Sequence, residues 1–415
     1  MVSGSFFSSR WVQCPDYVTE VADGRLPGGF RAAGVACGVK AGGRRDLGLV
    51  ISDSKETTSA ARFSRSGAQS APVLLTRQES KIWELRAVVV NSGNANAATG
   101  RRGLDDAGAM RAAAAAVAGV EPNHVAVAST GVIGVPLPID LITDGIAHVG
   151  DQLRIDGAAD FAEAIRTTDA FPKQVTLEIA LSTGTVRLSV QAKGAGMISP
   201  NFATLLVFVQ TDAAMDADEA ELLLSVCTKR SFDRISVDGQ LSTSDTIVLQ
   251  ASGVSGVRIE PKTEDERRFG EALDAALRQV ALLVAQDGEG ARRVGRVVVK
   301  GGDEHAVQRV AHAVADSPLV KTALYGGDPN WGRIIQAVGA ALPGAAPLQV
   351  DISIEGIVVC VNGSYVRHDE QALREAVSHQ EVEYEVVLPG EGAEAERYFS
   401  DLGHEYVTIN AEYTT

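Results

Sequence analysis

Thr204 is the residue of this 415-residue chain whose position most clearly suggests chemistry. It follows the glycine-punctuated run 193–203 and opens an apolar stretch. A hydroxyl alone is a weak nucleophile, but cleavage after Ala203 would give Thr204 a free α-amino group of pKa about 8, a base beside its own hydroxyl. Threonine also commonly begins strands. Spacing alone therefore favours a strand residue, and the nucleophile is the alternative.

A second group of small polar residues follows the predicted strand 125–128. Ser129, Thr130 and Gly131 combine hydroxyl groups with a glycine whose backbone N–H another molecule can approach closely. Such donors can form an oxyanion hole, which stabilises negative charge on a carbonyl oxygen during acyl transfer. The alternative is a tight turn between a strand and a helix.

Two charged positions could bind the ends of an amino acid. Lys193 suits a carboxylate, and the stretch Asp287-Gly288-Glu289-Gly290 suits an ammonium group. Lone charges on loops are usually solvated instead. The stretch 328–333, which contains Asn, Trp and Arg, predicts either a polar pocket or a buttressed turn.

Composition and charge exclude several classes of protein. A net charge of −15 disfavours nucleic acid and anionic membranes as partners. The four cysteines form no C-x-x-C pair and the seven histidines are scattered, so we expect neither a disulfide framework nor a metal site. There is no apolar run of transmembrane length and no secretory core near the N-terminus. We expect a cytoplasmic protein, with the mitochondrial matrix as the alternative because residues 1–15 lack acidic side chains.

Helical and strand patterns alternate along the whole chain, which predicts a layered mixed α/β sandwich rather than a Rossmann sheet. No G-x-G-x-x-G follows a predicted strand into a helix. We expect a loop at 91–94, capping boxes at Asp216 with Glu219 and at Thr263 with Glu266, and a strand over 406–409. Other expected elements are strands at 88–90, 125–128, 174–181, 185–191, 297–300 and from 204, a hairpin over 350–361, and helices over 105–117, 306–314 and from 139.

Taken together and in order, these segments resemble the ornithine acetyltransferase (glutamate N-acetyltransferase) family of arginine biosynthesis. The resemblance runs from about Gly28 to Thr415 and covers nearly the whole chain. The matching stretches are 29–34, 90–97, 128–134, 167–169, 193–204, 236–239, 287–291, 317–323, 328–333 and 410–415.

The resemblance implies a sandwich of the ornithine acetyltransferase/DmpA type that cleaves itself between Ala203 and Thr204. The products would be two interlocked chains: an α chain, 1–203, with the oxyanion hole, and a β chain, 204–415, that begins with the nucleophile. Thr204 would then carry the acetyl group from N2-acetyl-L-ornithine to L-glutamate, while the Thr130 hydroxyl and the Gly131 N–H stabilise the oxyanion.

The same resemblance implies the substrate contacts and the assembly. Thr167 is one of these contacts, and the neighbouring Thr168 could take its place because the loop that carries both residues varies. No metal or cofactor is implied, and acetyl-CoA stays open as a second acetyl donor. We expect the cleaved α and β chains to form a dimer of heterodimers. The implied substrate contacts are Thr167, Lys193, Thr204, Glu289, Asn410 and Thr415.

Three other interpretations stay open. A self-processing hydrolase or aminopeptidase would share the maturation step but pass the acyl group to water. A non-enzymatic scaffold would use Thr204 only as a strand residue. A paralogue with another acceptor is suggested where the chain departs from the family pattern: at Phe202, where Met is common, at 63–66, and at Gln240-Leu241, which replace a common acid-Thr pair.

Overall fold

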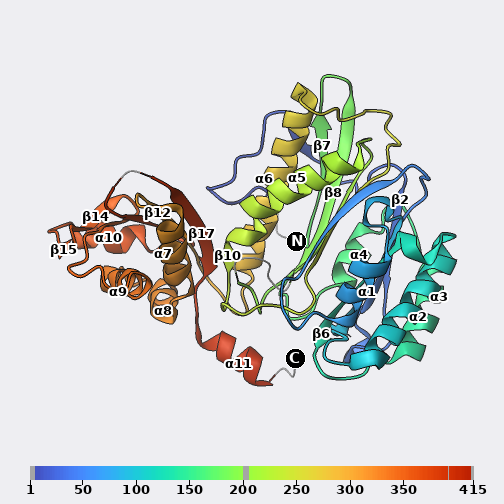
Figure 1. The fold of residues 1–415 in the computed structure, drawn as a ribbon, viewed down its shortest axis with the longest axis horizontal. Coiled ribbons are helices and arrows are strands. Elements are labelled where there is room, and N and C mark those ends of the chain that lie inside the picture. The colour runs from blue at the N-terminus through green and yellow to red at the C-terminus, as the bar shows by residue number, and fades with distance from the viewer. Residues whose placement is uncertain (1–4, 200–204, 391, 413–415) are drawn as a thin grey trace.

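The computed structural model describes residues 5–199, 205–390 and 392–412. These residues form three sheets with helices against them, and the prediction of a mixed α/β fold is confirmed (Figure 1). In the described part of the chain, no helix is long and apolar enough to cross a membrane.

The first sheet has the strand order β2-β3-β5-β6, and its last two strands run parallel. Helices α1, α2 and α3 cover one face with an apolar cluster, and α4 lies against the other. The strands are β2 (Phe30–Val35), β3 (Leu47–Ser52), β5 (Ala87–Asn94) and β6 (Val125–Val132); the helices are α1 (Ala71–Glu79), α2 (Gly100–Ala118), α3 (Ile139–Asp151) and α4 (Ala158–Ala164).

The second sheet has the order β1-β7-β8-β9-β11-β4, so strands from both sides of the Ala203–Thr204 junction share it. Its inner face packs on the first sheet and on α4, where the rings of Phe161 (α4) and Phe208 (β9) meet edge to face with their centroids 5.3 Å apart. Helices α5 (Ala217–Arg230) and α6 (Glu264–Gln286) cover its outer face, which completes a helix, sheet, sheet, helix sandwich. The strands are β1 (Val18–Glu20), β7 (Lys173–Ala180), β8 (Thr185–Lys193), β9 (Leu206–Thr211), β11 (Thr246–Ala251) and β4 (Thr58–Phe63).

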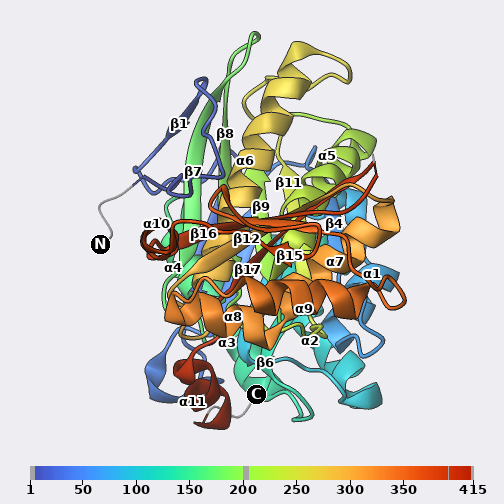
Figure 2. The ribbon, with the colours of Figure 1, turned by 90° about the vertical axis from the view of Figure 1, so that its left-hand side faces the viewer.

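The third sheet forms a second lobe beside this sandwich (Figures 1 and 2). One face packs with α7 (Glu304–Asp316), α8 (Pro318–Gly326), α9 (Trp331–Ala341) and α10 (Glu370–Ala376). A last helix, α11 (His404–Glu412), extends from this lobe toward the end of β6 (Figure 1). The strands, in sheet order, are β10 (Ile235–Ser236), β17 (Glu394–Ser400), β12 (Val294–Lys300), β16 (Glu381–Val387), β13 (Asp351–Ile354), β14 (Ile357–Val361) and β15 (Ser364–Tyr365). Short 3-10 turns are η1 (Ala41–Gly43), η2 (Ile82–Glu84), η3 (Pro122–His124) and η4 (Phe232–Arg234).

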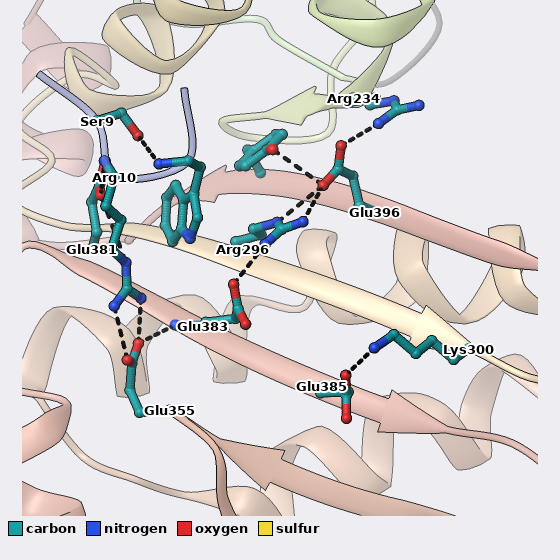
Figure 3. Close-up of polar contacts among 12 residues, drawn as sticks. Ser9, Arg10, Arg234, Arg296, Lys300, Glu355, Glu381, Glu383, Glu385 and Glu396 are labelled. Atoms are coloured by element: carbon teal, nitrogen blue, oxygen red, sulfur yellow. Dashed lines mark hydrogen bonds and ion pairs between the residues drawn. The ribbon is translucent and has the colours of Figure 1, made fainter. Parts of the chain in front are cut away.

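The opposite face of the third sheet carries a network of paired charges (Figure 3). Arg296 on β12 donates to Glu383 on β16 at 2.7 Å, and Lys300 donates to Glu385 at 2.5 Å. Arg10, near the N-terminus, reaches across to Glu355 at 2.9 Å. The N-terminal segment is thereby joined to the C-terminal lobe.

Most of the expected elements are present, with their ends shifted. The hairpin between β7 and β8 is confirmed, and so is the Thr263 cap, whose hydroxyl accepts the Glu266 N–H at 3.1 Å. Asp216 is the N-cap residue of α5 as expected, but its side chain makes no capping hydrogen bond and accepts one from Arg258 instead.

Two other expectations are wrong for reasons of tertiary pairing. Residues 91–94 are not a loop but the end of β5, because parallel pairing with β6 continues to Asn94. Residues 406–409 are not a strand but lie within α11. A β-branched sequence favours a strand only where a neighbouring strand can complete its ladder, and within the described residues no strand pairs with this segment. The strand expected from Thr204 starts at Leu206 in the structure; Thr204 itself lies outside the described residues.

Candidate active site

One pocket of about 240 Å³ opens between the sandwich and α11. It collects six of the residues that the sequence singled out, although they come from five separate parts of the chain. They are Thr130, Gly131, Thr167, Lys193, Glu289 and Asn410. The remaining predicted site residues, Ala203, Thr204 and Thr415, lie outside the described residues.

Gly131 lies on β6 directly against the backbone of Gly93 on β5. Its φ of +131° is one that residues with side chains rarely adopt, and an added Cβ would lie 2.4 Å from the carbonyl carbon of Gly93. The Ser129 hydroxyl donates to Asn91 at 2.5 Å, which ties the two strands together at this level. The polar run of β5 therefore supports the end of β6, and Thr130 and Gly131 line the pocket from there.

Lys193, the last residue of β8, places a buried ammonium group in the pocket wall. Its Nζ donates to the hydroxyl of Thr167 at 3.2 Å. Burial lowers the pKa of Lys193, and the carboxylate of Asp169 acts against this decrease. The pocket thus holds a poorly solvated cation, which favours binding of an anionic group.

A second buried lysine, Lys173, lies below this wall between two carboxylates. Its Nζ is 2.8 Å from Oδ1 of Asp169 and 2.6 Å from Oδ2 of Asp287, and its side chain is 0% exposed. Burial would raise the pKa of Asp169, but the ammonium groups of Lys173 and Lys193 hold it below its ordinary value. Burial raises the pKa of Asp287.

The two carboxylates also bind backbone groups that shape the pocket. Asp169 accepts the N–H of Gly194 at 2.7 Å and that of Thr167 at 3.1 Å. Asp287 accepts the N–H of Ala170 and lies two residues before Glu289. The Lys173 cluster, meaning Lys173, Asp169 and Asp287, therefore joins the three segments that carry Thr167, Lys193 and Glu289.

Among the described residues, Glu289 is one of two carboxyl groups that line the pocket, together with Asp238. Its Oε2 accepts the side-chain N–H of Asn410 at 2.5 Å, and burial raises the pKa of Glu289. The carboxylate also lies against Gly196, where an added Cβ would be 2.5 Å from Oε1. A side chain at 196 would therefore displace the Glu289 carboxylate from its present position.

Two further carboxyl groups hold the chain on either side of residues 200–204. Asp238 accepts the N–H groups of Met197 at 2.6 Å and Ile198 at 2.9 Å. Asp245 accepts the N–H of Leu205 at 3.0 Å, and burial raises the pKa of Asp245 to about 8. The described chain is therefore tied to a buried or partly buried carboxyl group both before and after residues 200–204.

Several residues that line the pocket were not predicted from the sequence to be substrate contacts. Asp238, Tyr406, Thr168, Gln240 and Leu241 line the pocket, although only Thr168 was considered as a substrate contact. A sequence signal existed for Asp238, which lies in the matched stretch 236–239.

Two parts of the chain that the sequence suggested for a binding site, Asp287 and the stretch 328–333, have other roles in the structure. Asp287, considered for an ammonium group of the substrate, binds Lys173 and does not line the pocket. Asn330 caps α9 by accepting the N–H of Arg333 at 3.2 Å, so the stretch 328–333 is a helix start in the second lobe.

The described residues offer no set of side chains that could bind a metal ion. No group of three or more His, Cys, Asp or Glu side chains there could hold a metal ion. The four cysteines are free thiols, two of them buried.

Comparisons with known proteins agree on one family. The model of the ArgJ family matches residues 31–415. The chain is 42% identical over 393 residues to a protein of Symbiobacterium thermophilum, with 94% of this chain and 98% of that protein covered. It is 40% identical over 403 residues to a protein of Bacillus anthracis, with 96% and 98% covered. Both relatives are named arginine biosynthesis bifunctional protein ArgJ.

A solved structure is also similar. It is described as ornithine acetyltransferase complexed with ornithine from Mycobacterium tuberculosis. Its chain is 39% identical, and the match covers 45% of this chain and 99% of that chain with a TM-score of 0.41.

Replacing Lys173 with methionine tests the buried cluster. Lys173→Met leaves two buried carboxylates without their shared cation, which costs about 3–5 kcal/mol when one partner of a buried pair is removed. We expect a large decrease in the midpoint of denaturant unfolding, and partial recovery in the double variant Lys173→Met/Asp287→Asn, which also removes one carboxylate. Lys229→Met, at an exposed lysine, is the control. Equal midpoints for Lys173→Met and Lys229→Met would contradict the role given to the cluster.

Proposed function

The chain belongs to the ArgJ family, as its motifs predicted, and on this premise we propose that it transfers the acetyl group of N2-acetyl-L-ornithine to L-glutamate through an ester on Thr204. The observation that carries the proposal is the single pocket in which the described oxyanion and substrate residues meet. The family membership supports the reaction class, and the pocket supports the residue roles.

The charges of the pocket fit a small amino acid. Lys193 presents a buried cation to the α-carboxylate that donor and acceptor share, and Thr167 holds that cation at 3.2 Å. Both substrates also carry the reacting nitrogen on the α-carbon. If Lys193 binds either substrate by its α-carboxylate, Glu289, which lines the same pocket, is available to the substrate side chain.

Glu289 can serve both substrates because they need opposite protonation states of one carboxyl group. An ionised Glu289 accepts hydrogen bonds from the δ-ammonium of acetylornithine. A protonated Glu289 donates to the γ-carboxylate of glutamate. Burial, which raises the pKa of Glu289, brings these two states closer in free energy near neutral pH than they are for an exposed glutamate.

Maturation precedes the transfer reaction. The Thr204 hydroxyl attacks the Ala203 carbonyl carbon, the C–N bond breaks, and the hydroxyl proton passes to the departing nitrogen. Water then hydrolyses the resulting ester, which leaves a carboxylate on Ala203 and a free hydroxyl and α-amine on Thr204. The hydrogen bonds that Asp238 and Asp245 accept from Ile198 and Leu205 restrain the chain on both sides of this bond.

The transfer itself uses the new amine as its base. The α-amine of Thr204 takes the hydroxyl proton as the oxygen attacks the acetyl carbon, and returns the proton to the departing α-nitrogen of ornithine. The α-amine of glutamate then attacks the ester, and N-acetylglutamate leaves with Thr204 restored. Thr130 and Gly131 donate to the oxyanion in both steps. Exchange of an acetyl group between two amines is nearly balanced in free energy, so no cofactor is required.

Two pocket residues bear on which amino acid accepts the acetyl group. Gln240 and Leu241, where this chain departs from the family pattern, both line the pocket. They lie in the same turn as Asp238, whose Oδ1 accepts the N–H of Gln240 at 3.1 Å. Differences in acceptor preference within the family would act through these two side chains.

Self-cleavage predicts two fragments in place of the 43.5 kDa chain. Denaturing mass analysis of the purified protein should show residues 1–203 and 204–415. Thr204→Ala should give one intact chain, because it removes the attacking oxygen. Equal cleavage of both proteins would assign the attacking group to another residue.

The transfer reaction predicts that product formation depends on glutamate. Incubation of the mature protein with N-acetylornithine and glutamate should give ornithine and N-acetylglutamate in equal amounts. Omitting glutamate should slow turnover to the rate at which water hydrolyses the acetyl-enzyme. Steady acetate release at the same rate with and without glutamate would instead indicate a hydrolase.

The role proposed for Glu289 predicts that the KM values of the two substrates change in opposite directions with pH. As the pH rises through the raised pKa of Glu289, the carboxyl group ionises, so KM should decrease for N-acetylornithine and increase for glutamate. KM for each, measured between pH ~5 and ~8, should lose this trend in Glu289→Gln, which cannot ionise. Parallel trends for the two substrates in the parent protein would contradict the shared role.

A further inference from the structure

Helix α11 borders the active-site pocket without an apolar anchor. None of its residues, 404–412, is buried, and Val407 is 67% exposed. By contrast, α7 buries a continuous set of apolar side chains in the second lobe. A helix of nine residues is marginal by itself in water. The position of α11 therefore depends on a small number of specific contacts.

Two of these contacts come from one face of the helix. Tyr406 and Asn410 are four residues apart, so they project from the same side, and both line the pocket. The Tyr406 hydroxyl donates to Oδ2 of Asp238 at 3.3 Å, and the Asn410 amide donates to Oε2 of Glu289 at 2.5 Å. At the start of the helix, His404 meets the ring of Tyr325 edge to face at 6.2 Å.

The two polar contacts differ in how they respond to substrate. Glu289 is the group that faces the substrate side chain in the proposed reaction, so the Asn410 contact competes with substrate binding. Asp238 is already fixed by the backbone N–H groups of Met197, Ile198 and Gln240. Its contact with Tyr406 does not involve Glu289, the carboxyl group proposed to bind the substrate side chain.

Tyr406 is also a dependable donor. Burial raises the pKa of its phenol, and the Asp238 carboxylate raises it further. The hydroxyl keeps its proton at neutral pH, and the hydrogen bond to Asp238 remains.

An acyl-enzyme that transfers its acetyl group to an amine must keep water out while it waits for the acceptor. The wall of this pocket opposite β6 and β8 is formed in part by α11. We propose that Tyr406, through its hydrogen bond to Asp238, is a positioning residue that holds α11 over the pocket and thereby sets how the acetyl group is divided between the amino acceptor and water. This inference rests on the proposed transfer reaction.

The variant Tyr406→Phe tests the proposal because it keeps the ring and removes only the hydroxyl. Val407→Ala is the matched control on the exposed face of the same helix. Both variants should cleave fully. With N-acetylornithine and glutamate, the ratio of acetate to N-acetylglutamate should rise roughly two- to tenfold in Tyr406→Phe, the factor that corresponds to one lost hydrogen bond. Val407→Ala should keep the ratio of the parent protein.

A second measurement follows the helix itself. Amide hydrogen exchange of residues 404–412 should be faster in Tyr406→Phe than in Val407→Ala. Equal product ratios in Tyr406→Phe and Val407→Ala would overturn the proposal while the parent protein still forms N-acetylglutamate. A parent protein that forms no N-acetylglutamate would overturn the proposed function instead.

Discussion

The ammonium group of Lys173 lies out of solvent between Asp169 and Asp287, and the shape of the pocket depends on it. A buried charge is costly unless its partners surround it, so this lysine allows little displacement of the segments that carry the two carboxylates. Those segments also supply Thr167 and Glu289, and Asp169 binds the N–H that follows Lys193. The positions proposed to contact the substrate are therefore set by an ion cluster that does not itself line the pocket.

A different constraint shapes the side of the pocket lined by Thr130 and Gly131, the donors proposed for the oxyanion hole. There the backbones of β5 and β6 approach so closely that only glycine fits at 131, and the side chain of Asn91 binds Ser129 across the strands. Hydrogen-bond donors on a packed strand end do not need to reorganise when charge develops on the substrate, which is the physical requirement for an oxyanion hole. The site thus combines a rigid half built on strands with a half closed by α11, which is held by polar contacts.

Much of this arrangement could be predicted from residue types in order along the chain. The alternation of strands and helices predicted the mixed fold, and the family motifs named six residues that the structure places in one pocket. Lys173 could not be found in this way, because its partner Asp287 is 114 residues away and a lysine at the start of a strand looks like an exposed charge. Residues 406–409 were predicted to be a strand because they include β-branched residues. The sequence did not reveal that no strand of the described sheets pairs with them.

The sequence by itself determined the chemistry that is available: a threonine that self-cleavage would convert into an N-terminal nucleophile, a hydroxyl and a glycine at a strand end, and one cation and one anion for an amino acid. Local patterns carry this information because each residue type has its own reactivity and each motif its own spacing. Only the tertiary structure decided which charges meet. In the folded chain, Asp287 binds Lys173, Glu289 lines the pocket, and the Tyr406 hydroxyl donates a hydrogen bond to Asp238. Burial and distance determine whether a carboxylate supports the fold or faces a substrate, and both arise only when segments far apart in the sequence pack together.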